Sequence, residues 1–285
     1  MHTHTVFCDG HDDIETFCRV AGDRNFAALG FSAHAPIRRK TGFASDWHLE
    51  EDRLGEYMDA VRAARRRWEG KLAVFLGLEV DYVEGLVGPA DRDIRELDLD
   101  YRIGSVHYLV PPAGEPFTVD GSPAEYARGL AEGFGGDEDA LAAAYWGAVC
   151  AMIRAGGFDI LGHIDLIKKN ARPREPGARL LRLIDEAADL LGRAGIVAEV
   201  NTGGMIRYGI PEPYPGLSIL RTLKARGVPV TVTADAHRAE HLGGHYETAR
   251  DILLEAGYDH ALIPSASGCS SMAACCFKLV QHPVR

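Results

Sequence analysis

The sequence has few cysteines and no pattern that would pair them. Its six cysteines form no Cys-x-x-Cys pair and show no disulfide-like spacing, which is typical of reduced thiols in a reducing compartment. No apolar stretch is long enough to span a membrane, and the first residues lack the basic start and apolar run of a signal peptide. We therefore expect a cytoplasmic protein without a membrane partner.

Basic charge is also scarce. The chain has 31 lysines and arginines against 41 acidic residues, which gives a formal net charge of −10. Because an acidic surface repels nucleic acid, we expect no nucleic-acid partner. The chain also lacks the motifs GxxxxGK(S/T), GxGxxG after a strand and GxSxG. These absences exclude phosphate-binding loops of the nucleotide type and a serine nucleophile elbow.

Short apolar runs alternate with amphipathic segments along the chain. This alternation predicts β/α units around a parallel sheet, and seven or eight such units predict a closed barrel. We expect one α/β domain over residues 1–285, with no assigned place for the tail at 265–285. Strands are expected over residues 3–7, 27–33, 73–80, 101–107, 160–163, 196–201, 228–234 and 260–264. Helices are expected over residues 13–21, 49–68, 124–131, 138–155, 178–193, 216–226 and 240–256.

Residues that commonly bind metals recur where these strands end. Seven of the twelve histidines lie at strand ends or just beyond them, and in a barrel all such ends converge on one opening. In the motifs HTH and DAH, the two ligand-type residues are two positions apart, so on an extended strand both point to one side. A single histidine is more often structural, but the whole set predicts a metal cluster. Its members are His2, His4, His11, His34, Glu79, His107, His163, Asp235 and His237.

The remaining five histidines lack this placement. His241 and His245 are four positions apart on an expected helix, but no glutamate follows the first histidine as it does in zinc proteases. We therefore interpret this pair as solvated. His48, His260 and His282 show no partner pattern.

With these residues assembled, the sequence resembles the polymerase and histidinol phosphatase (PHP) family of metal-dependent phosphoesterases and, within it, the monofunctional histidinol-phosphatases. The resemblance runs from HTHTVFCDGH through SAHAP, GLEVD, GSVH, GHIDLIKK and EVNTGG to TADAH. It implies a distorted (β/α)7 TIM-like barrel holding three divalent ions, which are commonly zinc, manganese or iron in this family. By position, the first ion would take His2, His4, Glu79 and Asp235, the second Glu79, His107 and His163, and the third His11, His34 and His237.

The resemblance also implies hydrolysis of a small phosphate ester, L-histidinol phosphate, by a hydroxide that bridges two metal ions. Glu79, Asp235 and His237 would take part in catalysis. Asp9 is a candidate proton donor for the leaving group, and a role as a turn residue or as a partner of a ligand is an equal alternative. Because His2 directly follows the first methionine, we expect a flexible chain end to hold this ligand less firmly.

Three residues are candidates for substrate binding. Arg207 and Lys168 offer cations for phosphate, and Asn201 ends an expected strand on the side of the opening. Histidinol carries an amine, so acidic side chains of the expected loops, such as Asp46 or Glu84, are candidates to attract it.

Three alternatives remain open at this point. The first is a PHP-type phosphoesterase acting on another small phosphoester. The second is an enzyme acting on nucleic-acid ends, which the acidic charge and the lack of a basic stripe with interleaved aromatics disfavour. The third is a non-catalytic module in which the metals only stabilise the fold. Structural metal sites usually have closed coordination, whereas a cluster at a barrel opening usually leaves positions for water.

Overall fold

The computed structural model describes residues 1–37, 45–112, 115–171, 175–265 and 278–283. Its strands are β1 (Ala28–His34), β2 (Ala73–Asp81), β3 (Tyr101–Ser105), β4 (Tyr108–Leu109), β5 (Phe117–Thr118), β6 (Ile160–Leu161), β7 (Val197–Asn201), β8 (Val230–Thr233), β9 (His260–Ser265) and β10 (Lys278–Pro283). Its α-helices are α1 (Ile14–Asp23), α2 (Leu54–Arg67), α3 (Arg92–Arg95), α4 (Pro123–Phe134), α5 (Glu138–Ala155), α6 (Ala178–Ala194), α7 (Gly203–Tyr208), α8 (Leu217–Ala225) and α9 (Tyr246–Glu255). Short 3-10 helices are η2 (Glu51–Arg53), η3 (Leu166–Lys169) and η4 (Ala239–His241).

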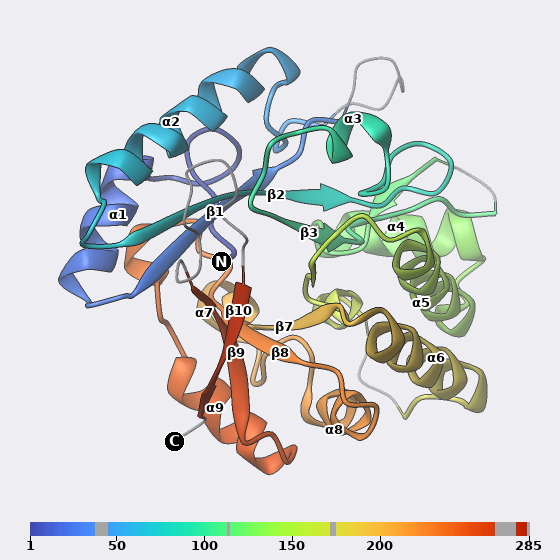
Figure 1. Cartoon of the computed structure of the whole chain (residues 1–285). Helices are drawn as coiled ribbons and strands as arrows, with labels where there is room; N and C mark the ends of the chain where they lie inside the picture. The colour runs from blue at the N-terminus through green and yellow to red at the C-terminus, as the bar shows by residue number, and fades with distance from the viewer. Residues whose placement is uncertain (38–44, 113–114, 172–174, 266–277, 284–285) are drawn as a thin grey trace.

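Six parallel strands form the central sheet, in the order β1-β2-β3-β6-β7-β8. Every neighbouring pair is parallel, so all six carboxyl ends lie on the same side. Figure 1 shows the sheet curling, with α1, α2, α5, α6, α8 and α9 arranged around its outer surface. The predicted α/β, TIM-like fold is confirmed, and the strand ends surround one opening.

The segment around Thr3 lies between the first and last strands of this sheet. Thr3 forms a parallel bridge with Ala236, just after β8, and its carbonyl accepts a hydrogen bond from the amide of Ser32 in β1 at 3.0 Å. The strand expected at the N-terminus is thus reduced to one bridge, because the chain turns back immediately and the amide of Gly10 donates to the carbonyl of Thr5. This bridge completes the ring that the six regular strands leave open.

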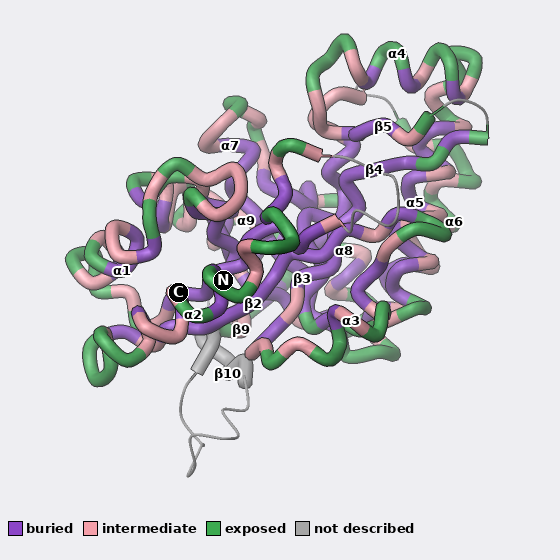
Figure 2. The backbone as a smooth tube through the Cα atoms, turned by 90° about the horizontal axis from the view of Figure 1, so that it is seen from above, coloured by how far each residue is buried: buried purple, intermediate pink, exposed green. Residues whose placement is uncertain are grey.

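Side chains alternate along the strands between the surrounding helices and the interior of the ring. In β2, Leu76 and Leu78 belong to the core that packs beneath α1 and α2, whereas Phe75 belongs to a separate interior cluster. Glu79 and Asp81 have the same parity as Phe75 and are also buried. Figure 2 shows the strands of the parallel sheet largely buried and the outer faces of the helices exposed. The amino-terminal part of the interior is therefore apolar and its carboxyl end is polar.

The first residue is anchored in the apolar part of this interior. Met1 packs against the interior cluster, and the hydroxyl of Tyr101 donates to the Met1 carbonyl at 2.5 Å. A Cβ atom at Gly30 would lie 2.7 Å from the Met1 sulfur, so glycine makes room for this side chain. The expectation of a flexible end before His2 is corrected, because packing and a hydrogen bond fix the preceding residue.

Local capping signals explain where the helices start. Asp137 precedes α5 and its carboxylate accepts from the amide of Ala140 at 3.0 Å. Ser122 caps α4, which begins with a proline, and its hydroxyl accepts from the amide of Glu125 at 3.1 Å. These caps satisfy amides that have no partner within the helix.

Several elements differ from the sequence-based expectations. The strand expected over 260–264 is present as β9, but it pairs antiparallel with β10 outside the parallel sheet. The β4-β5 hairpin lies where no strand was expected, and α3 and α7 lie where no helix was expected. Within the tail, β10 is described, whereas residues 266–277 and 284–285 lie outside the described part. Among the described helices, none has the length and apolar character that crossing a membrane requires.

Candidate metal centre

The predicted ligand residues gather where the parallel strands end. His34 is the last residue of β1, and it is the direct neighbour of Glu79 in the register between β1 and β2. The interior-facing parity of β2 points the Glu79 side chain into the opening rather than towards the helices. Other members are carried by the Thr3 bridge or by the residues after β3, β6 and β8: His2, His4, His107, His163, Asp235 and His237.

Glu79 lies at the centre of this arrangement. Its side chain is fully buried, and imidazole nitrogens surround both carboxylate oxygens. Oε2 lies 2.9 Å from His2 Nε2, 3.3 Å from His4 Nε2 and 3.1 Å from His34 Nδ1, while Oε1 lies 3.1 Å from His163 Nε2 and 3.6 Å from His107 Nε2. Each oxygen of one carboxylate therefore faces a different set of histidines, as a bridging ligand would.

A second buried carboxylate, Asp235, faces two of the same histidines. Its Oδ1 lies 3.2 Å from His4 Nε2 and 3.7 Å from His2 Nε2. Its Oδ2 accepts a hydrogen bond from the guanidinium of Arg207 at 2.8 Å. The backbone at Asp235 has φ +46°, a left-handed conformation that aspartate adopts more readily than most residues. His2 and His4 therefore each contact both Glu79 and Asp235.

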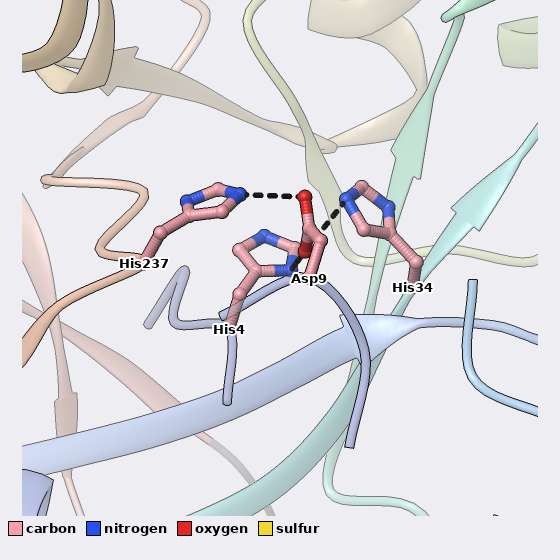
Figure 3. A group of neighbouring side chains, drawn as sticks. All are labelled: His4, Asp9, His34 and His237. Atoms are coloured by element: carbon pink, nitrogen blue, oxygen red, sulfur yellow. Dashed lines mark hydrogen bonds and ion pairs between the residues drawn. The ribbon is translucent and has the colours of Figure 1, made fainter. Parts of the chain in front are cut away.

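Figure 3 shows a third group, in which Asp9 lies between three histidines. Asp9 Oδ2 lies 3.0 Å from His237 Nε2, and Oδ1 lies 3.5 Å from His4 Nδ1 and 3.8 Å from His34 Nε2. The turn that reduces the N-terminal strand to one bridge brings Asp9 back towards His4. The family resemblance implies His11, not Asp9, as the partner of His34 and His237.

Several of these atoms lack a hydrogen-bond partner among the described residues. The buried atoms in question are His2 Nε2, His4 Nε2, Asp9 Oδ1, His34 Nδ1 and Glu79 Oε2. Four groups of these side chains bring their ligand atoms within 4.8 Å of one another: His4, Asp9, His34 and His237; His2, Glu79 and His163; His2, His4 and Asp235; and His34, Asp81 and His107. Imidazole nitrogens and carboxylate oxygens are the donors that zinc, manganese and iron accept. The residues present therefore fit divalent metal ions.

The electrostatics of the centre favour ionised carboxylates. Burial alone raises the pKa of Glu79, but the surrounding imidazoles, those of His2 and His34 foremost, together hold the pKa well below its usual range. Burial likewise raises the pKa of Asp235, but the Arg207 guanidinium and the neighbouring imidazoles together hold it well below its usual range. Both carboxylates are therefore negatively charged at neutral pH in a site that excludes most water, which favours bound cations.

Sequence reasoning missed two carboxylates that orient ligand histidines. His2 Nδ1 lies 2.6 Å from an oxygen of Glu199, and His107 Nδ1 lies 2.8 Å from Asp81 Oδ1. The other oxygen of Asp81 lies 2.7 Å from Nε2 of His48, which is buried although its sequence context showed no partner. Such contacts leave the opposite ring nitrogen available for a metal. Each carboxylate lies two positions from a predicted site residue in the same strand, and this spacing was the available signal.

A cavity of about 400 Å³ opens over the cluster. Besides ligand-type residues, its lining includes Trp47, Asp120, Lys169, Arg207 and Arg238. The cavity is thus lined on one side by histidines and carboxylates and elsewhere by several cationic side chains. A small anionic molecule bound there would contact both groups.

The three candidate substrate-binding residues lie in different environments. Arg207 lines the cavity. Lys168 is not among the described residues that line it, and its ammonium pairs with two acidic side chains. The neighbouring Lys169 lines the cavity instead. Asn201 is fully buried and donates to Asp235 Oδ2 at 3.3 Å, so it contacts a ligand-type residue rather than the open space.

Other candidates lie at the edge of the site or away from it. His11 is exposed and lines the cavity, but it is outside the four groups that the described residues form. Its amide donates to the carbonyl of His237 at 2.8 Å. Asp46 and Glu84 are exposed and are not among the described residues that line the cavity. His241, interpreted from the sequence as solvated, is part of the lining.

Comparison with known proteins identifies the family. The PHP domain family matches residues 1–203, and the chain belongs to this family. A protein of Deinococcus radiodurans named probable histidinol-phosphatase is 30% identical over 258 residues, which are 90% of this chain and 92% of the relative.

Two solved structures share the fold. A structure from Listeria monocytogenes has a TM-score of 0.77 at 22% identity and covers 87% of this chain and 98% of its own. Histidinol phosphate phosphatase of Lactococcus lactis, solved in complex with zinc, L-histidinol and phosphate, has a TM-score of 0.64 at 18% identity and covers 92% and 94%.

Proposed function

We propose that this protein is a metal-dependent phosphomonoesterase that hydrolyses L-histidinol phosphate to L-histidinol and phosphate. The observation that carries the proposal is the buried carboxylate of Glu79, surrounded by five imidazoles beneath a cavity that Arg207 lines. The Deinococcus relative carries the corresponding name, and the Lactococcus structure contains both products of this reaction. Bound cations would also explain how an acidic protein accepts an anionic substrate.

The side-chain groups suit three ions with one change to the sequence-based assignment. The first ion would be held by His2, His4, Glu79 and Asp235, the second by Glu79, His107 and His163, and the third by His34, His237 and Asp9. Asp9 replaces His11 in the third set because both of its oxygens face histidine nitrogens, whereas the His11 side chain is exposed. When bound, such ions lower the pKa of a coordinated water and neutralise charge on phosphoryl oxygens.

Arg207 is the side chain best placed to orient the phosphoryl group. Two of its nitrogens donate to Asp235, at 2.8 Å to the carboxylate and 3.0 Å to the carbonyl. Its Nε is buried and has no hydrogen-bond partner among the described residues. The residue lines the cavity, where its positive charge would attract a phosphoryl oxygen. Lys169 supplies a second cation at the cavity wall, in the role first expected of Lys168. Asn201 acts indirectly, by holding the carboxylate of Asp235.

Phosphate release from a panel of monoesters tests this function. The purified protein is loaded with zinc, manganese or iron and given L-histidinol phosphate, other small phosphomonoesters and nucleotides. We expect L-histidinol phosphate to be preferred by at least about tenfold in kcat/KM. A smaller preference would refute the substrate assignment, preferential hydrolysis of nucleic-acid ends would favour an exonuclease, and no hydrolysis with bound metal would favour a structural module.

The role of Glu79 is tested by Glu79→Gln. This change removes one negative charge from the point where two ion sites meet, so both metal content and turnover should collapse. The matched control is Glu255→Gln, which alters an exposed glutamate that pairs with Arg221 on the surface. Normal metal content with near-normal turnover in Glu79→Gln would contradict the bridging role.

A further inference from the structure

The cavity wall contains one carboxylate that the metal centre does not use. Asp120 lines the cavity, but it belongs to none of the four ligand groups that the described residues form. Within the described part of the chain, its side chain makes no hydrogen bond or ion pair. The other acidic residues in the lining are Asp9, Glu79 and Asp235, and all three face ligand histidines. Asp120 is thus the acidic group of this wall that remains available to a ligand.

The backbone around Asp120 is fixed close to the centre. The amide of Val119 donates to the carbonyl of His107 at 2.8 Å, so Asp120 lies one residue from a direct contact with a ligand-bearing segment.

Two neighbouring side chains at the end of η3, those of Lys169 and Asn170, hold the same segment from its other side. The amide of Asn170 donates to the carbonyls of Val119 and Gly121, each at 3.1 Å. The ammonium of Lys169 donates to the carbonyl of Asp120 itself. Hydrogen bonds thus hold three successive carbonyls, and Asp120, which lines the cavity, is the middle residue of this held segment. Ligand binding therefore does not have to order this segment, so the entropy loss of ordering it does not weaken binding.

We propose that Asp120 binds a protonated amine on the alcohol portion of the substrate. The phosphate end of a bound ester belongs at the ligand histidines and Arg207, so the alcohol end must extend along the cavity wall. An ammonium there would form a charge-assisted hydrogen bond with Asp120. This inference rests on the proposed function, because L-histidinol phosphate carries such an amine. It replaces Asp46 and Glu84, the loop residues first considered for this role.

A pair of substrates tests the proposal. The two esters are L-histidinol phosphate and the analogue 3-(imidazol-4-yl)propyl phosphate, which lacks the amine. The measured quantity is the ratio of their kcat/KM values, in the metal-loaded wild type and in Asp120→Asn. We expect Asp120→Asn to lower this ratio about 10- to 100-fold, chiefly through KM for the amine-bearing ester, as is typical for loss of one charge-assisted hydrogen bond.

Further variants separate binding from structure. Asp120→Glu keeps the charge and should retain more of the ratio than Asp120→Asn. Asn170→Ala loosens the backbone clamp without touching the carboxylate, so it should lower the ratio in the same direction. The matched control is Glu115→Gln, which alters an exposed glutamate outside the cavity lining.

The possible failures can be told apart. If the wild type hydrolyses both esters equally well, or if Asp120→Asn slows both by the same factor, the amine-binding role is refuted while the phosphatase assignment stands. If the wild type hydrolyses neither ester but cleaves other monoesters, the proposed function itself is wrong. Unchanged metal content and circular dichroism in each variant establish that the ratios report on binding.

Discussion

Replacing Glu199 with glutamine should stop His2 from binding a metal ion, although Glu199 is not itself one of the proposed ligands. Glu199 is fully buried, and its two oxygens accept from different donors. Oε1 accepts from His2 Nδ1 at 2.6 Å and from the Thr233 hydroxyl at 2.5 Å. Oε2 accepts from the Asn201 amide at 3.0 Å and from the backbone amide of His163 at 2.9 Å.

The glutamine side chain can make all of its hydrogen bonds in only one of its two amide orientations. Its NH2 group cannot occupy the Oε2 position, because the His163 backbone amide there is an obligatory donor. With its NH2 at the Oε1 position, the Thr233 hydroxyl can turn to accept, and His2 can accept only if its proton moves from Nδ1 to Nε2. That tautomer blocks Nε2, the nitrogen that faces Glu79 at 2.9 Å. The variant should therefore fold, yet lose His2 as a ligand.

Glu199→Gln should reduce metal affinity strongly and the stability of the metal-free protein only moderately. One charge-assisted hydrogen bond is weakened, which costs about 1.5–3 kcal/mol in the free energy of unfolding of the metal-free protein. Metal affinity should fall at least about 10- to 100-fold, because the ligand itself is lost and not merely its orientation. Competition with a chromophoric chelator measures the affinity, and urea unfolding measures the stability. Glu255→Gln is the surface control. Metal affinity within twofold of wild type in Glu199→Gln would refute this reasoning.

Three other outcomes are expected. Asp81→Asn weakens the acceptor shared by His107 and His48, so metal affinity should fall about tenfold in the same chelator assay, and an unchanged affinity would contradict this. Burial raises the pKa of Cys18 to about 12 and that of Cys150 to about 11, so alkylation of both at pH 8 should be far slower than in urea when followed by peptide mass spectrometry. Removing bound metal with a chelator should lower the Tm by at least about 5 °C and metal should restore it, because ligands that bind only the folded state stabilise it; calorimetry checks this.

The regular elements were predictable because the chain repeats one pattern. The apolar run expected over 73–80 became β2, and its alternation placed Glu79 inside the ring. The N-terminal strand was overestimated because the apolar residues after His4 look like a continuing strand. The turn that ends it depends on Gly10, where a Cβ atom would lie 2.3 Å from the backbone of His4. Such a tertiary contact leaves little trace in hydrophobic periodicity.

The location of the histidines was predictable because residues at the carboxyl ends of parallel strands all lie at the same opening. Residues outside strands were harder. Lys168 and Lys169 are adjacent on η3, where each step rotates the side chain by about 120°. One therefore pairs with acidic side chains while the other lines the cavity. His11 and Asp9 pose the same difficulty, because both follow the Thr3 bridge and only the turn decides which side chain faces His237.

The bridge at Thr3 links metal binding to the order in which the chain is made. The contact between Asp9 and His237 joins residues 228 positions apart, and the partners of Thr3 lie in β1 and just beyond β8. During synthesis, Thr3 and Asp9 are made early, but their partners after β8 are made only near the end of the chain. We therefore expect metal loading to be a late step of biogenesis, because a chain that stops before β8 has His2 and His4 but not the carboxylate of Asp235.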